Sequence, residues 1–510
     1  MHARPSTRTR LPALVLSLIL SVAAGPAETM AEAFRAAPCE ADPAPVTGVT
    51  GVTCGHLRVP RSRAPGAEPG WLDLPVARFE GGDGPPLLYL NGGPGGSVRS
   101  GGGQGLASWS ELAGAFAQAG TGDLILMSQR GTDDASADHL RCPELVAYRQ
   151  ALLTDRSLAD QREQRSGLQR AIITCRTRAQ DHGLDLTAYS VDETVSDILA
   201  LKQALGIDRW VVYGVSFGGR LALELARRDR AGIAALILDS PDPPGTDTVL
   251  HRARNLDRAL ARVAALCRDD RACRRATPRL KAAIDRLAMR LAREPVRTTV
   301  YLADRDTTVT VTLTATALIE AISYTLSHRG TIARLPYAVA AALDESFELL
   351  GELAARTAVD SGSVVFGTAA SVDCQTFGPG RVARALERDG ADLPAYGPFV
   401  RSAAGRARAI CDIWLPDQTT PPPPTPVVTD VPALILAGEL DPATPLEAAD
   451  FLAGRLTRAV AMRYRYAAHG VLGQSQCAWA DVAAFLRGDT VASDCDREAE
   501  RLRFWGPLTR

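Results

Sequence analysis

Residues 210–219, Trp-Val-Val-Tyr-Gly-Val-Ser-Phe-Gly-Gly, constrain the fold of this chain more than any other stretch. A short β-branched and aromatic run ends in Gly-x-Ser-x-Gly, and a leucine-rich helical pattern follows directly. Glycines at 214 and 218 remove the Cβ clashes that would forbid a very sharp strand-to-helix turn. Such a turn strains Ser216 and exposes its hydroxyl, so we predict a nucleophile there, with an ordinary turn serine as the alternative.

The N-terminus has the pattern of an export signal. Three arginines lead into an apolar run over 11–24, and small residues follow. This predicts a signal peptide over residues 1–27, cleaved between 24 and 31, and therefore a secreted or periplasmic bacterial protein. An uncleaved membrane anchor is the alternative, but the apolar run is too short to span a bilayer comfortably.

The ten cysteines fall as neighbours along the chain and show no zinc-like spacing. In an exported chain they predict disulfides rather than metal sites, although sequence alone does not fix the connectivity. Sequential pairing gives Cys39–Cys54, Cys142–Cys175, Cys267–Cys273, Cys374–Cys411 and Cys477–Cys495. The net charge of −1 and the lack of a basic cluster argue against nucleic acid as a partner.

Short strand-like runs alternate with helical patterns, which is typical of a mostly parallel sheet covered on both faces. Eight strands are predicted, at 55–59, 72–79, 87–90, 123–127, 210–213, 235–239, 433–437 and 462–466. A serine turn after the fifth strand is the order expected of an α/β-hydrolase. Strand signals largely vanish after residue 240, so we predict a core over 39–240, a helical lid over 241–371, and the rest of the core over 372–510.

A serine hydroxyl needs a base, and the base needs a carboxylate that fixes its tautomer. Among seven histidines, His469 alone follows a late predicted strand, so we predict that it is the general base; a buried structural histidine is the alternative. Asp441, after the seventh predicted strand, is the predicted acid. Glu439, closer to that strand, and Asp239, at the end of the sixth, are its rivals.

An oxyanion hole requires donors aimed at the developing negative oxygen. We predict the backbone N–H of Phe217 as one donor. The second is expected in the loop Asn91-Gly92-Gly93-Pro94-Gly95-Gly96, with Gly93 preferred and Gly92 as the adjacent alternative. A flexible linker or a phosphate cradle would also use such glycines, but no Gly-Lys-Ser/Thr follows, which excludes a P-loop.

Together these motifs resemble the proline iminopeptidase and tripeptidyl aminopeptidase group of α/β-hydrolases. Residues 91–95 resemble its His-Gly-Gly-Pro-Gly, 128–132 its Asp-Gln-Arg-Gly-Thr, 214–218 its serine turn and 436–445 its acid loop. Segments around Cys54, Cys374, Cys411 and the 477–495 tail resemble its secreted tripeptidyl branch. Three residues depart from the pattern: Asn91 replaces histidine, Ser128 replaces aspartate, and Asp133 stands where glycine usually follows Thr132.

The resemblance implies a secreted serine exopeptidase that releases tripeptide or proline-type N-terminal units through an acyl-enzyme. Its partners would be peptides with a free N-terminus, and it would need no metal or organic cofactor. Acidic lid residues often bind the substrate amino group in such enzymes, and Glu320, Glu345 and Glu348 are candidates, with a solvated helix face as the alternative for each. A carboxylesterase is the alternative function, because the same triad serves both, and an inactive binding protein is a third.

Overall fold

The computed structural model describes His2 and residues 33–39, 47–98, 106–154, 161–360, 364–422, 424–491 and 501–505. The predicted signal peptide therefore lies outside the described residues, apart from His2. No helix among the described residues is both long enough and apolar enough to cross a membrane.

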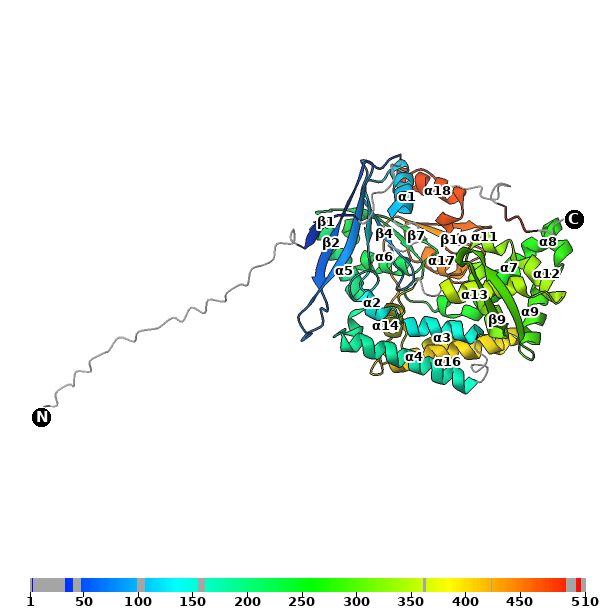
Figure 1. The fold of residues 1–510 in the computed structure, drawn as a ribbon. Coiled ribbons are helices and arrows are strands. Elements are labelled where there is room, and N and C mark those ends of the chain that lie inside the picture. Colours follow the sequence, from blue (N-terminus) through cyan, green and yellow to red (C-terminus); the bar gives the residue numbers. More distant parts are fainter. Residues whose placement is uncertain are drawn as a thin grey trace.

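The centre of the molecule is a nine-stranded sheet (Figure 1), in the order β1-β2-β3-β5-β4-β6-β7-β10-β11. Every pairing from β5 to β11 is parallel, whereas β1, β2 and β3 join one edge in antiparallel fashion. The strands are β1 (Phe34–Ala37), β2 (Gly51–Pro60), β3 (Trp71–Glu80), β4 (Leu87–Leu90), β5 (Leu124–Met127), β6 (Trp210–Val215), β7 (Ile233–Asp239), β10 (Ala433–Gly438) and β11 (Ala459–Tyr464).

The predicted fold class is confirmed, but the predicted number of eight strands is wrong. The additional strand, β1, is only four residues long and has no alternation of buried and exposed positions. It is held at the sheet edge by backbone pairing with β2, which no side-chain pattern announces. The other eight strands lie where they were predicted, with ends that differ by up to four residues.

Helices cover both faces of the sheet. One face packs against α1 (Leu106–Gln118) and α18 (Gln476–Arg487), where the aromatic ring of Phe116 meets Tyr213 and Trp479. The other face packs against α5 (Val191–Ala204), α6 (Phe217–Arg228) and α17 (Leu446–Ala453). Buried side chains on both faces explain why strands β4 to β7 read as continuous apolar runs.

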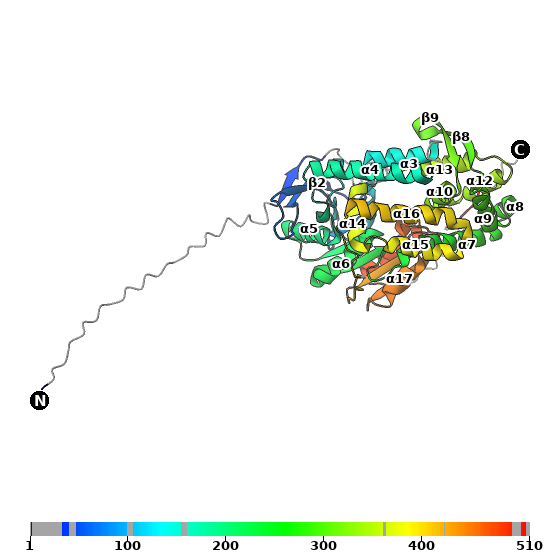
Figure 2. The ribbon, with the colours of Figure 1, turned by 90° about the horizontal axis from the view of Figure 1, so that it is seen from below.

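Between β7 and β10 the chain forms a second, mainly helical region with its own apolar core (Figure 2). Its helices are α7 (Arg252–Asp269), α8 (Arg271–Ala276), α9 (Leu280–Leu291), α10 (Ala315–Leu326), α11 (Arg329–Ile332), α12 (Leu335–Leu343), α13 (Glu348–Asp360), α14 (Phe366–Phe377), α15 (Arg381–Asp392) and α16 (Gly397–Trp414). A hairpin of β8 (Val296–Leu302) and β9 (Thr307–Leu313) belongs to it. The domain boundary that we placed at residue 371 lies inside α14.

Helices that precede the serine turn also pack against this helical region. They are α2 (Ala137–Leu140), α3 (Pro143–Thr154) and α4 (Gln161–Asp181), and both views show α3 and α4 beside α16 (Figures 1 and 2). Four of the predicted disulfides are present, namely Cys39–Cys54, Cys142–Cys175, Cys267–Cys273 and Cys374–Cys411. Of the fifth predicted pair, Cys477 forms no disulfide with a described residue, and Cys495 lies outside them.

Candidate active site

Ser216 sits at the turn between β6 and α6 in a strained backbone conformation. Its φ of 56° and ψ of −119° are rare for a residue with a side chain. The flanking glycines are required by close approach: a Cβ on Gly214 would lie 2.4 Å from the Gly218 carbonyl oxygen, and one on Gly218 would lie 2.0 Å from the Leu90 carbonyl oxygen. The turn is therefore the sharp one that the sequence predicted.

The structure brings Asp441 and His469 together. Nδ1 of His469 lies 2.8 Å from Oδ2 of Asp441. The carboxylate is buried and also accepts hydrogen bonds from the Thr444 hydroxyl, at 2.7 Å, and from two backbone N–H groups of its own loop. Its rival Glu439 forms an ion pair with Arg262 of α7, which directs that carboxylate toward the lid.

Electrostatics favour an ionised pair at this contact. Burial lowers the pKa of His469, but the nearby Asp441 carboxylate and, more weakly, Asp239 raise it by more, so its pKa lies above the ordinary value. Burial raises the pKa of Asp441, but the His469 charge and the hydrogen bonds from His469 and Thr444 lower it by more. A carboxylate so placed orients the imidazole and stabilises its protonated form.

Asp239, the other rival acid, has a different place. Its buried carboxylate accepts hydrogen bonds from the N–H groups of Val471, at 2.7 Å, and Leu472, at 2.9 Å. Its backbone carbonyl accepts the N–H of Ser216 at 2.9 Å. One residue at the end of β7 thus joins the Ser216 turn to the loop that carries His469.

The glycine loop after β4 lies against the Ser216 turn. A Cβ on Gly92 would stand 3.1 Å from the Ser216 Cβ, so a side chain there would push the two segments a few tenths of an ångström apart. Within the described chain, neither the N–H of Phe217 nor that of Gly93 donates a hydrogen bond to another backbone group. The Phe217 N–H opens α6, where the helix dipole favours a negative oxygen.

The three residues that depart from the family pattern lie in one hydrogen-bonded network around this loop. Asp133 accepts hydrogen bonds from the hydroxyls of Ser128, at 2.8 Å, and Ser97, at 2.5 Å. Ser97 in turn accepts one from the Asn91 amide at 3.2 Å, and Gln129 donates to the Asn91 carbonyl at 2.9 Å. Asp133 thus places a carboxylate 2.8 Å from the Ser128 hydroxyl.

The predicted acidic lid residues are engaged elsewhere. Glu320 pairs with Arg406 at 2.5 Å, Glu345 pairs with Arg290 at 2.6 Å on the outer surface, and exposed Glu348 accepts the hydroxyl of Ser346. None of these three contacts involves a residue of the Ser216 turn or of the loops that carry Asp441 and His469. Among the described residues, no group of histidine, cysteine or acidic side chains is arranged to hold a metal ion.

Asp373, on α14, is an acid that the sequence analysis missed. Burial raises its pKa to about 6, with Arg252 acting in the opposite direction. Its helix begins at the glycine loop, where the Val365 N–H donates to Gly95, and ends where Phe377 lies under the Arg220 guanidinium of α6. Asp373 therefore lies on a helix whose two ends contact the glycine loop and α6, and only its position directly before Cys374 could have drawn attention to it.

Comparison with known proteins places this geometry in a family. The sequence matches the alpha/beta hydrolase fold over residues 85–472. No match was found among curated proteins.

Similar solved structures include a proline iminopeptidase from Mycobacterium smegmatis (16% identity, 85% of this chain and 98% of that chain covered, TM-score 0.36) and an esterase from Exiguobacterium antarcticum (14% identity, 82% of this chain and 96% of that chain covered, TM-score 0.32). Epoxide hydrolases from hot-environment metagenomes are represented as well (14%, 85% and 97%, TM-score 0.34), and at such scores these neighbours do not distinguish one substrate from another. Because the matched region contains the Asn91 loop, the Ser216 turn, Asp441 and His469, the chain belongs to the alpha/beta hydrolase fold family.

Proposed function

We propose that the protein is a secreted serine exopeptidase that releases short N-terminal units from peptides. Ser216 attacks the scissile carbonyl while His469 accepts its proton, and the N–H groups of Phe217 and Gly93, or its neighbour Gly92, stabilise the oxyanion. Protonated His469 then donates its proton to the leaving amine, and a water activated by the same histidine hydrolyses the acyl-enzyme.

One observation carries the proposal. The 2.8 Å contact between His469 and buried Asp441 is the arrangement that a histidine base needs, and Asp239 links its loop to the strained Ser216 turn. The choice of peptides over esters is supported by the motifs that resemble the aminopeptidase group. It is also supported by Asp373, an acid on the helix α14 that joins the glycine loop to α6, because a carboxylate there suits a substrate ammonium group.

The test is hydrolysis of a matched panel by the mature protein and by its Ser216→Ala variant. The panel contains single-residue, prolyl and tripeptidyl arylamides with a free amino group, the same compounds with a blocked amino group, and short acyl esters. We expect turnover of the free-amino arylamides that is lost in Ser216→Ala. Turnover of esters alone would point to a carboxylesterase, and failure of a reactive-serine probe to label Ser216 would contradict a hydrolase mechanism altogether.

A further inference from the structure

The peptide group that follows His469 is held at both ends. Its N–H, which belongs to Gly470, donates to the hydroxyl of Ser240 at 2.9 Å. Its carbonyl oxygen accepts a hydrogen bond from the side-chain amide of Gln474 at 2.5 Å, and the same amide donates to the Gly470 carbonyl at 3.2 Å. One side chain therefore holds two successive carbonyl groups of the loop that carries the candidate base, while the core holds the N–H between them.

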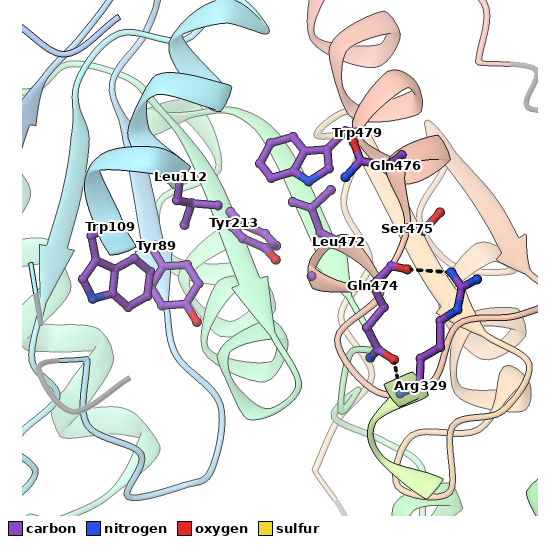
Figure 3. A pocket seen from close by; sticks show the side chains of 11 residues that line it. Tyr89, Trp109, Leu112, Tyr213, Arg329, Leu472, Gln474, Ser475, Gln476 and Trp479 are labelled. Carbon is purple, nitrogen blue, oxygen red and sulfur yellow. Dashed lines mark hydrogen bonds between the residues drawn. The ribbon is translucent and has the colours of Figure 1, made fainter. Parts of the chain in front are cut away.

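The other end of the Gln474 amide is bound to the helical region. Its side-chain oxygen accepts the backbone N–H of Arg329, the first residue of α11, at 2.9 Å. The Arg329 guanidinium donates to the backbone carbonyl of Gln474 at 3.2 Å, and Figure 3 shows both hydrogen bonds in the wall of a cavity. These partners fix the orientation of the amide, because its NH₂ group has to face the two carbonyls and its oxygen has to face the N–H.

Arg329 is itself held by the C-terminal segment. Its guanidinium donates to the carbonyl of Arg501 at 3.1 Å. The two residues Leu502 and Phe504 of that segment are buried in the apolar core of the helical region. Gln474 therefore joins the His469 loop to a helix that is anchored on its far side.

These contacts bear on the reaction because His469 has to bring its second ring nitrogen, Nε2, to the Ser216 hydroxyl. The hydrogen bond between Nδ1 and Asp441, at 2.8 Å, orients the imidazole ring but leaves the position of the backbone to the loop. A displacement of about 1 Å at a reacting group can reduce a rate about 100-fold. The hydrogen bonds from Gln474 restrain the backbone at His469 itself.

We propose that Gln474 is a positioning residue for the base, and that it transmits the position of α11 to His469. The proposal rests on the proposed hydrolytic function, which gives His469 the role of base. Gln474 acts through the peptide groups on either side of Gly470 and not through the substrate. A shift of α11 away from the core would remove the partner of the Gln474 oxygen and would loosen the loop that carries the base.

Two substitutions of Gln474 separate its contact with the loop from its contact with α11. Gln474→Met removes the donors and the acceptor at a similar side-chain length, whereas Gln474→Glu, ionised at pH 8, keeps an acceptor for the Arg329 N–H and loses both donors. We expect kcat to fall about 10- to 100-fold in both variants, with KM changed less than threefold, for arylamides and short acyl esters alike. Gln203→Met, at an exposed glutamine of α5, is the matched control. A wild-type kcat in either Gln474 variant would overturn the proposal.

A double-mutant cycle with His469→Ala tests whether Gln474 acts through the base. When two residues act as a unit, their losses do not add, and the second substitution costs little once the first is made. We expect Gln474→Met to lower the residual ester hydrolysis of His469→Ala less than twofold. An equal factor in both backgrounds would indicate a general structural effect and would contradict the proposal. Thermal unfolding shows whether each variant is folded, and Gln474→Glu takes the place of Gln474→Met if the latter does not fold.

Labelling of Ser216 separates this proposal from the peptidase function. A fluorophosphonate probe reacts with a serine that its base activates, and it needs no peptide turnover. Labelling at least tenfold slower in both Gln474 variants supports the positioning role even if no peptide is hydrolysed. Equal labelling rates in the wild type and the variants contradict that role even if the protein proves to be a peptidase.

Discussion

The carbonyl oxygen of Asp239 accepts the N–H of Ser216 at 2.9 Å, while the side chain of Asp239 holds the loop that follows His469. The proposed nucleophile and base come from segments about 250 residues apart, and a single buried residue joins the two segments, through its backbone carbonyl on one side and its carboxylate on the other. Burial raises the pKa of Asp239, and the N–H groups of Leu472 and Val471 act against that shift. These hydrogen bonds favour the charged carboxylate, whereas burial favours the neutral acid.

Asp239→Asn should weaken both the fold and the reaction. The asparagine NH₂ cannot accept a backbone N–H, so Val471 or Leu472 loses its acceptor in a buried site. We expect a loss of about 1–3 kcal/mol in the free energy of unfolding, together with a lower kcat. Chemical denaturation and steady-state kinetics would measure both, with the surface change Asp489→Asn as the control. An unaltered kcat would mean that Asp239 does not set the position of His469.

Asp441→Asn distinguishes the acid from its neighbour Glu439. An asparagine would favour the wrong tautomer of His469 and would remove the charge that stabilises its protonated form. We expect kcat to fall by about 10⁴, with the fold retained. Glu439→Gln, which breaks only the ion pair with Arg262, should change kcat by less than tenfold. The reverse order of the two effects would assign the acid to Glu439.

The pH dependence should follow the raised pKa of His469. The base must be neutral to accept the Ser216 proton, so kcat/KM rises with pH as His469 loses its proton. Because the net shift is upward, we expect the midpoint above the ordinary histidine value of about 6.5. N-blocked esters, measured between pH 5 and 9, isolate this titration, and Asp441→Asn should move the midpoint down. A wild-type midpoint below 6 would contradict the assignment.

Asp373→Asn tests the acid on α14. Its pKa of about 6 means that the carboxylate is charged at neutral pH and neutral in mild acid. For substrates with a free amino group, KM should therefore fall as pH rises through 6, and the variant should lose this dependence. At pH 7 we expect KM to rise about 10- to 100-fold in the variant, with N-blocked esters unaffected. Glu348→Gln on the exposed lid surface is the control, and an equal effect on blocked substrates would exclude ammonium binding.

The sequence predicted those parts of the site whose chemistry is local. A strand, two glycines and a helix pattern suffice to place Ser216, and the order of late strands suffices to place Asp441 and His469. Asp373 was not found from the sequence because its neighbourhood is created by long-range contacts that join the ends of α14 to the glycine loop and to α6. The role of Asp239 was open for the same reason, since its two N–H partners lie 232 and 233 residues further along the chain.

The departures from the family pattern show the same limit. In the sequence, Asn91, Ser128 and Asp133 are three separate substitutions. In the structure they belong to one network, because β4 and β5 are adjacent and bring the loops after them together. A relation between Ser128 and Asp133 can be inferred only once their contact is known.

The contact between Ser128 and Asp133 predicts that a second substitution restores the activity lost on removal of the Asp133 carboxylate. Asp133→Gly removes the acceptor shared by Ser97 and Ser128, which loosens the loop that carries Gly92 and Gly93. Because oxyanion donors act mainly in the transition state, kcat should fall about 10- to 100-fold with KM little changed. Ser128 is the partner of Asp133 in a 2.8 Å hydrogen bond, so adding Ser128→Asp places a new carboxylate close to the lost one. The double variant Ser128→Asp/Asp133→Gly should therefore recover most of kcat. Melting temperatures would show whether each variant is folded. A folded double variant no faster than Asp133→Gly alone would show that the position of the carboxylate, and not only its charge, is required, and would refute the compensation.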